Sequence, residues 1–157
     1  MNFITALFLA VTTFFQSIFG IETPPPPIVN TIRVYLVPTA TDLEIHISGS
    51  NQNLSAIAVR LVYHYSKTPS GITITPNALL FKDNWNFPVK KTIVNAAQKA
   101  VTLDLAAVNI STTGYLLNSD LLLAKINSSA GLDQFSFDQK ETKIYSRDAN
   151  EIPLIFN

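Results

Sequence analysis

Only two histidines and no cysteine are available in this 157-residue sequence for nucleophilic or metal chemistry. His46 falls on the polar side of an alternating segment, and His64 stands between two tyrosines. No Gly-x-Ser-x-Gly elbow surrounds any serine, so a Ser–His–Asp site is not indicated. The histidines could meet across two strands as a metal pair, assisted by Asp42 or Glu44. Nothing in their spacing requires this, and we expect ordinary surface histidines.

The carboxylates do not form a recognisable catalytic or metal-binding pattern either. Asp133, Asp138, Asp148 and Glu151 gather in the last quarter of the chain, where a loop calcium site is an open alternative. No Asp-x-Asp-x-Asp-Gly loop is present, and all five glycines are isolated, which argues against a phosphate loop. We therefore expect no enzyme activity, no bound metal and no cofactor.

Trp85 is the single tryptophan and lies within the aromatic-rich stretch 83–87. An exposed indole on a β-sheet could stack on a sugar ring, whereas a buried one closes the core, and we favour burial. The sequons at Asn53, Asn109 and Asn127 matter only in a host that glycosylates them.

The elements that must position these residues are strands. β-Branched and aromatic runs, several alternating with polar residues, recur every 8 to 15 residues with turn residues between them. This pattern predicts an all-β sandwich, with at most one helical turn over 77–83. The expected strands cover 31–37, 42–48, 54–65, 72–75, 89–94, 99–105, 121–126, 134–137, 142–145 and 152–156.

The first 21 residues differ from the rest because they contain no charged side chain. A helix over 3–21 would be roughly 28 Å long, close to the thickness of a bilayer core. Residues 1–21 are therefore predicted to be one hydrophobic helix, either a signal peptide or a retained membrane anchor. Residues 22–29, with four consecutive prolines, read as a stiff linker, and 30–157 as the folded domain. The membrane segment carries half of the ten phenylalanines: Phe3, Phe8, Phe14, Phe15 and Phe19.

Composition restricts the partners of the folded domain. Eleven basic residues balance eleven acidic ones, and only 14% of the chain is charged. This excludes a polybasic nucleic-acid binder, and the hydrophobic content of 47% excludes a disordered chain. Serine, threonine and asparagine supply the polar surface instead, which fits a secreted or cell-surface location.

From Leu54 onward the order of these segments resembles the cohesin-like domain. The resemblance covers about two thirds of the chain and implies an antiparallel jelly-roll β-sandwich of about nine strands. It also implies a binding or scaffolding role at the cell surface, since cohesins bind dockerins through one sheet face. The stretches that carry it are 58–64 (AVRLVYH), 101–106 (VTLDLA), 121–126 (LLLAKI), 135–138 (FSFD) and 143–145 (KIY).

The chain departs from the cohesin pattern at positions where the family contacts its partner. His64 stands where the family usually has Asp after Tyr, and alanines lie near the positions of the Asn and Asp that grip dockerin. These departures weigh against the usual dockerin contact. The same strand nevertheless predicts a partner site, because its outward side is unusually apolar for a solvated face. The residues expected on that side are Ala56, Ala58, Arg60, Val62 and His64.

The sequence thus favours a non-catalytic module, membrane-tethered or secreted, that docks a protein partner on a sheet face. One alternative is a carbohydrate-binding module that uses Trp85 on a polysaccharide. Another is a surface-filament subunit whose N-terminal helix packs into a fibre core. A covering loop or the linker could also account for the apolar side of strand 54–65.

Overall fold

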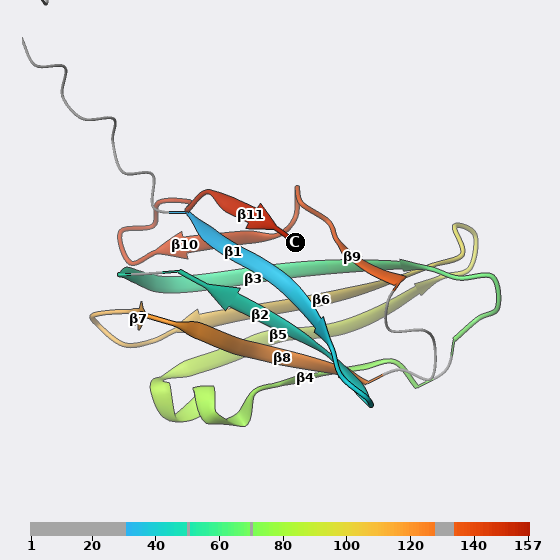
Figure 1. Ribbon diagram of the computed structural model, residues 1–157, viewed down its shortest axis with the longest axis horizontal. Coiled ribbons are helices and arrows are strands. Elements are labelled where there is room, and N and C mark those ends of the chain that lie inside the picture. The colour runs from blue at the N-terminus through green and yellow to red at the C-terminus, as the bar shows by residue number, and fades with distance from the viewer. Residues whose placement is uncertain (1–30, 50, 70, 128–133) are drawn as a thin grey trace, which may run out of the picture.

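The computed structural model describes residues 31–49, 51–69, 71–127 and 134–157. Two β-sheets pack face to face in this part of the chain (Figure 1), which confirms the predicted all-β sandwich. The expected helix over 1–21 and the linker over 22–29 lie outside the described residues. Among those residues, no helix is long and apolar enough to cross a membrane.

The first sheet contains five strands in the order β11-β1-β2-β8-β4. Strand β2 shows how the sequence sets this layer, since Leu43, Ile45 and Ile47 are buried while the residues between them are half-buried. The strands are β1 (Ile32–Pro38), β2 (Asp42–Ser48), β4 (Thr73–Pro76), β8 (Asp120–Asn127) and β11 (Leu154–Phe156).

The second sheet contains six strands, with the path β10-β3-β6-β5 and with β7 and β9 also paired to β3. Its long strand β3 therefore has four partners and forms the centre of this layer. The strands are β3 (Gln52–His64), β5 (Trp85–Asn95), β6 (Ala100–Asn109), β7 (Tyr115–Leu117), β9 (Phe135–Phe137) and β10 (Lys143–Ser146).

Two details of the expected topology are wrong. The described residues contain eleven strands rather than about nine, and the unexpected one, β7, has only three residues, too few to show a pattern of its own. The sandwich is also not wholly antiparallel, since β11 pairs parallel to β1 with Leu154 opposite Ile32. A strand that returns to the edge of a sheet from a distant part of the sequence is free to take either direction.

The short helix expected over 77–83 is present as the 3₁₀ helix η1 (Ala78–Asp83). Asn77 caps its start by accepting a hydrogen bond from the Leu79 N–H, and Asn84 ends it in the left-handed conformation with φ of 63°. The helix leads directly into β5 and places Leu80 in the core.

The core lies between the sheets and is built from the inward sides of both. Aliphatic residues dominate it, with aromatic rings toward the ends of the strands. Its largest fully buried side chains are Ile32, Leu43, Ile45, Ile47, Leu54, Ile57, Leu61, Leu80, Leu103, Leu105, Leu117 and Leu123.

One end of the sandwich is called the entry end below, because β1 begins there at Ile32. The registers place the start of β3, the end of β6 and the start of β5 at the same end. Helix η1 and strand β7 also lie at this end, on the left in Figure 1.

Candidate functional site

Strand β3 divides its side chains between the core and the outer surface as the sequence predicts. Ile57, Val59 and Leu61 are buried against the other sheet, so the alternate residues point outward. The outward set is the predicted one, and it is half-buried except for the exposed His64: Ala56, Ala58, Arg60, Val62 and His64.

Neighbouring strands extend this surface sideways, and the whole is called the β3 face. Ala58 lies opposite Ala106 of β6, and Ala106 in turn pairs with Val89 of β5. Because two of these three side chains are single methyl groups, the centre of the face is a shallow hollow of about 220 Å³. Val89, which is 39% exposed, forms one wall of the hollow.

A charged row crosses the β3 face beside this hollow. Arg60 Nε lies 2.7 Å from Asp104 Oδ1 and Nη2 lies 3.2 Å from Oδ2, which makes the pair bidentate. Glu141 adds a second carboxylate 3.5 Å from Arg60 Nη1. The hydrogen bond with Asp104 raises the pKa of Arg60 further above its already high value. Arg60 is therefore held in place by two carboxylates beside the apolar hollow.

The alternative of a metal pair formed by His46 and His64 is contradicted by the structure. His46 belongs to β2 in the five-stranded sheet, whereas His64 ends β3 in the six-stranded sheet. Two strands that are close in sequence thus place their histidines on opposite sides of the sandwich. In the described part of the chain, no group of three His, Asp or Glu side chains is arranged to hold a metal ion.

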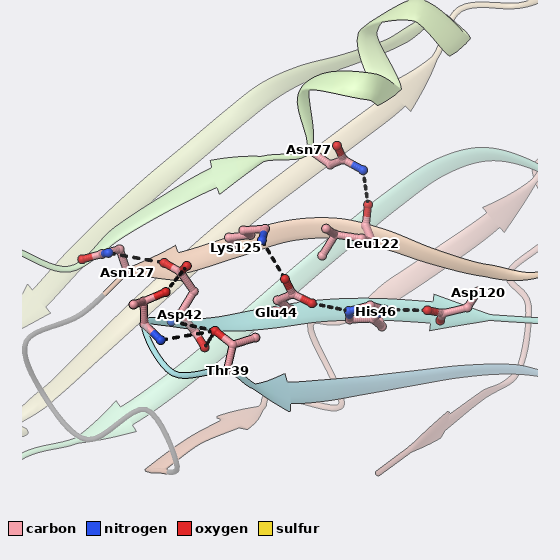
Figure 2. Close-up of polar contacts among 10 residues, drawn as sticks. Thr39, Asp42, Glu44, His46, Asn77, Asp120, Leu122, Lys125 and Asn127 are labelled. Carbon is pink, nitrogen blue, oxygen red and sulfur yellow. Dashed lines mark hydrogen bonds and ion pairs between the residues drawn. The ribbon is translucent and has the colours of Figure 1, made fainter.

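His46 instead belongs to a charged network on the outer side of the five-stranded sheet (Figure 2). Its Nδ1 lies 2.7 Å from Asp120 Oδ2, and its Nε2 lies 3.0 Å from Glu44 Oε2. Each ring nitrogen therefore faces a carboxylate oxygen. Lys125 Nζ lies 2.7 Å from Glu44 Oε1, and Tyr35 stacks on the imidazole while its hydroxyl donates to Asp120.

Each ionisable group in this network has a charged or hydrogen-bonding partner within the network. Lys125, and then His46, lower the pKa of the Glu44 carboxyl. Glu44 in return raises the pKa of Lys125, and the hydrogen bond to Asp120 raises the pKa of the Tyr35 hydroxyl. Every member has a charged or polar partner, so the network serves to hold β1, β2 and β8 together.

Trp85 is buried, as favoured from the sequence, so the alternative of a glycan contact at this residue is wrong. Only 2% of it is exposed, and its ring centroid lies 5.7 Å from that of Tyr115. The indole Nε1–H meets no acceptor among the described residues. A core position thus explains the aromatic-rich stretch around Trp85, and no face of the indole is open to a sugar.

The late carboxylates serve local roles in turns and ion pairs. Asp138 Oδ1 accepts hydrogen bonds from the backbone N–H groups of Lys140 and Glu141, and Glu151 pairs with Lys143 at 2.5 Å. Asp148 is exposed, and Asp133 lies outside the described residues. The calcium alternative therefore gains no support from the residues that are described.

The three sequon asparagines occupy different environments. Asn109 is buried, with Nδ2 donating to the Asp83 carbonyl at 2.8 Å and Oδ1 accepting from the Ser111 N–H at 3.0 Å. Asn127, whose Nδ2 donates to Asp42 at 3.3 Å, and Asn53 are both exposed. These two sequons are thus more open to modification than Asn109.

Sequence reasoning also missed residues that the structure places on the surface. Large apolar side chains of η1 and of the loop after β6 are exposed, among them Leu79, Phe81 and Ile110. The only sequence signal for these exposed apolar residues was the run Ala-Leu-Leu-Phe at 78–81, of which only Leu80 is buried in the structure. Because a 3₁₀ turn has a period of three, such a short run does not show which residue points inward.

Comparison with known proteins shows what this architecture resembles. The cohesin CaCohA2 from Clostridium acetobutylicum matches with a TM-score of 0.54 and 14% identity, over 82% of this chain and 86% of that one. A complex described as the third cohesin ScaC with the ScaB dockerin, from Acetivibrio cellulolyticus, matches with a TM-score of 0.53 and 13% identity, over 80% and 94%. The chain has a cohesin-like fold. This confirms the resemblance found in the sequence.

The cohesin likeness extends to a further complex. The Coh-OlpC–Doc435 type I cohesin–dockerin structure from Clostridium thermocellum matches with a TM-score of 0.51 and 12% identity, over 87% of this chain and 94% of that one. No protein-family model and no curated protein matches the sequence. At these identities the likeness establishes the fold, and the partner must be argued from this chain's own residues.

Proposed function

We propose that this chain is a non-catalytic module that docks a protein partner on the β3 face, outside the cell. The apolar centre of that face carries the proposal. Ala58, Ala106 and Val89 form a shallow hollow beside the fixed Arg60–Asp104 pair. A small apolar centre with a polar rim is the usual anatomy of a protein interface.

The fold supports a protein partner over a small substrate. Two of the similar structures are cohesins in complexes with dockerins. The hollow itself is open and shallow, whereas small-molecule sites are deep clefts of about 300–1,000 Å³. The network around His46 satisfies its own charges and offers no competing reactive centre.

The surface also indicates what the partner must present. Ala58 and Ala106 leave room for an aliphatic side chain at the centre, while Arg60 is already neutralised by Asp104 and Glu141. Recognition is therefore expected to depend on shape and apolar burial rather than on charge, and to change little with salt.

Photo-crosslinking tests the docking face directly. Benzoylphenylalanine placed at Ala58 is expected to capture a specific protein from an extracellular extract of the producing organism. The matched control is Thr75, an exposed residue of β4 in the other sheet. Capture of the same protein through both positions, or through neither, would refute the docking face.

Two further measurements test separately whether the β3 face is the docking surface and which class of protein docks there. Ala58→Asp and Val89→Asp are expected to abolish capture while the melting temperature stays close to that of the parent protein, and Thr75→Asp is expected to leave capture intact. Titration against a panel of purified dockerins then shows whether the partner belongs to that class. A captured protein that is no dockerin supports the docking face and excludes the dockerin class.

A further inference from the structure

The entry end of the sandwich carries an unusual number of exposed apolar side chains. Nine large hydrophobic residues are exposed in the described part of the chain, and five of them lie at this end. The most exposed are Ile110 at 70% and Leu79 at 64%. The five residues are called the entry-end patch: Leu79, Phe81, Val108, Ile110 and Leu116.

Hydrogen bonds join the two halves of the patch into one surface. The Ile110 N–H donates to the Asn84 carbonyl at 2.9 Å, and Asn109 Nδ2 donates to the Asp83 carbonyl at 2.8 Å. These bonds fasten η1 to the end of β6. Phe81 packs edge-on against the buried Phe87, with ring centroids 5.4 Å apart. The patch is therefore a built surface rather than a set of scattered residues, and exposure of this kind marks an interaction site.

The point where residues 1–30 join the folded domain indicates what the entry-end patch contacts. Strand β1 begins at this end, next to the end of β7, because a Cβ at Gly49 would lie 3.3 Å from Ile32 and 3.2 Å from Leu117. Residues 1–30 precede this point, and the first 21 of them carry no charge. If residues 1–21 lie in a bilayer, residues 22–30 reach roughly 28 Å at the rise of a polyproline helix.

The same geometry favours the entry end over the opposite end. Strand β3 contains 13 residues, and at about 3.3 Å per residue it separates the two ends by roughly 40 Å. A linker with a reach of roughly 28 Å would keep the entry end within that distance of the membrane, whereas the far end could extend beyond it. The exposed apolar residues are concentrated at the end where this linker joins the domain.

We propose that the entry-end patch rests on the surface of a lipid bilayer, with Leu79, Phe81 and Ile110 in the interfacial region. Lys82 and Asp83 are neighbours at the end of η1 and cancel in charge, as do Arg147, which donates to the Thr112 carbonyl, and its neighbour Asp148 at the same end. Binding is therefore driven by apolar burial and has no preference for anionic lipids. Val108 lies opposite Ala56, so the patch borders the β3 face, but the hollow at Ala58, Ala106 and Val89 is left free for a partner.

The single tryptophan provides the probe. Trp85 follows Asn84, whose carbonyl accepts the hydrogen bond from Ile110, so the indole lies directly beneath the patch. The full chain is reconstituted in phosphatidylcholine vesicles containing lipids brominated near the headgroup end of the acyl chains. Bromine quenches tryptophan fluorescence over a short range, so Trp85 is expected to be quenched, equally with and without anionic lipid.

Matched variants distinguish the patch from the tether. Leu79→Ser with Ile110→Ser is expected to abolish the quenching while the protein still floats with the vesicles. Ile93→Ser with Val94→Ser removes similar exposed side chains from the distant part of β5 and is expected to leave the quenching unchanged. Melting temperatures identify any variant that fails to fold, and Leu79→Ser alone then replaces the double variant.

Three results would overturn the proposal. The first is a vesicle-bound chain whose Trp85 is not quenched, and the second is quenching that both double variants retain. The third is a chain that does not associate with vesicles at all. If the Leu79 and Ile110 substitutions instead convert a dimer to a monomer in sedimentation, a second copy covers the patch and the lipid contact is rejected.

Discussion

Removing the Arg60–Asp104 pair tests whether the charged row on the β3 face stabilises the sheet beneath it. We expect a double-mutant cycle with Arg60→Met and Asp104→Asn to give a coupling free energy of about 1 kcal/mol. This is the upper end of the range for solvated pairs, because the contact is bidentate and Asp104 is only 19% exposed. Arg60 is 36% exposed, and solvent screening keeps the coupling from being larger.

The size of the expected shift follows from the size of the domain. An unfolding entropy near 2.1 cal/mol/K per residue gives about 0.27 kcal/mol/K for about 127 residues. A coupling of about 1 kcal/mol therefore corresponds to about 4 °C in melting temperature. Thermal and urea denaturation of the parent, both single variants and the double variant supply the four values of the cycle.

A second ion pair supplies the comparison. Lys143 and Glu151 approach to 2.5 Å, but both are well exposed, so the same cycle on this pair is expected to give a smaller coupling. In 1 M salt the Arg60–Asp104 coupling is expected to fall, since the screening length is then about 3 Å. A coupling below about 0.2 kcal/mol at low salt, or one equal to that of the exposed pair, would refute the structural role of the Arg60–Asp104 pair.

Two further predictions concern the other sheet and the turns. The pKa of Glu44 is lowered in the folded protein, so its stabilising contribution is present above its ordinary value of 4.5 and is lost as the pH falls through the lower folded value. Glu44→Gln is therefore expected to reduce stability at pH 7 and to converge with the parent in acid; parallel stability curves down to pH 2 would contradict this. Gly114→Ala is expected to destabilise by more than Gly71→Ala. Both glycines have positive φ, but only at Gly114 would a Cβ come within 2.9 Å of a carbonyl oxygen, that of Leu54. Equal losses in urea denaturation would show that backbone conformation alone sets the cost.

The parts of the fold that could be predicted from sequence are those where one side of a strand is buried. Strand β2 alternates without interruption, and the outward side of β3 follows from the same period. The start of β5 is predicted too late, at 89 rather than Trp85, because a proline at 88 normally interrupts a strand. In the structure the ladder passes Pro88 through a register shift between Asn86 and Val89, which accommodates a residue without an N–H.

The arrangement of the site could be predicted only within one strand. The row from Ala58 to Val89 joins β3 to the hairpin of β5 and β6, and no local pattern indicates that this hairpin lies beside β3. The same limit left the His46–His64 metal pair open as an alternative, since the turn between the two residues leads from one sheet to the other. Periodicity reports which way a residue points, whereas sheet assignment depends on long-range pairing.

Strand β3 has a consequence for how the molecule assembles. It pairs with β6, β7, β9 and β10, and Leu61 lies opposite Phe137, which comes from the last part of the chain. Chain closure over such separations is entropically costly and slow. Until β9 and β10 arrive from the end of the chain, one edge of β3 is open along most of its length. The strand that carries the proposed docking surface is therefore the one most in need of protection while the chain is being made.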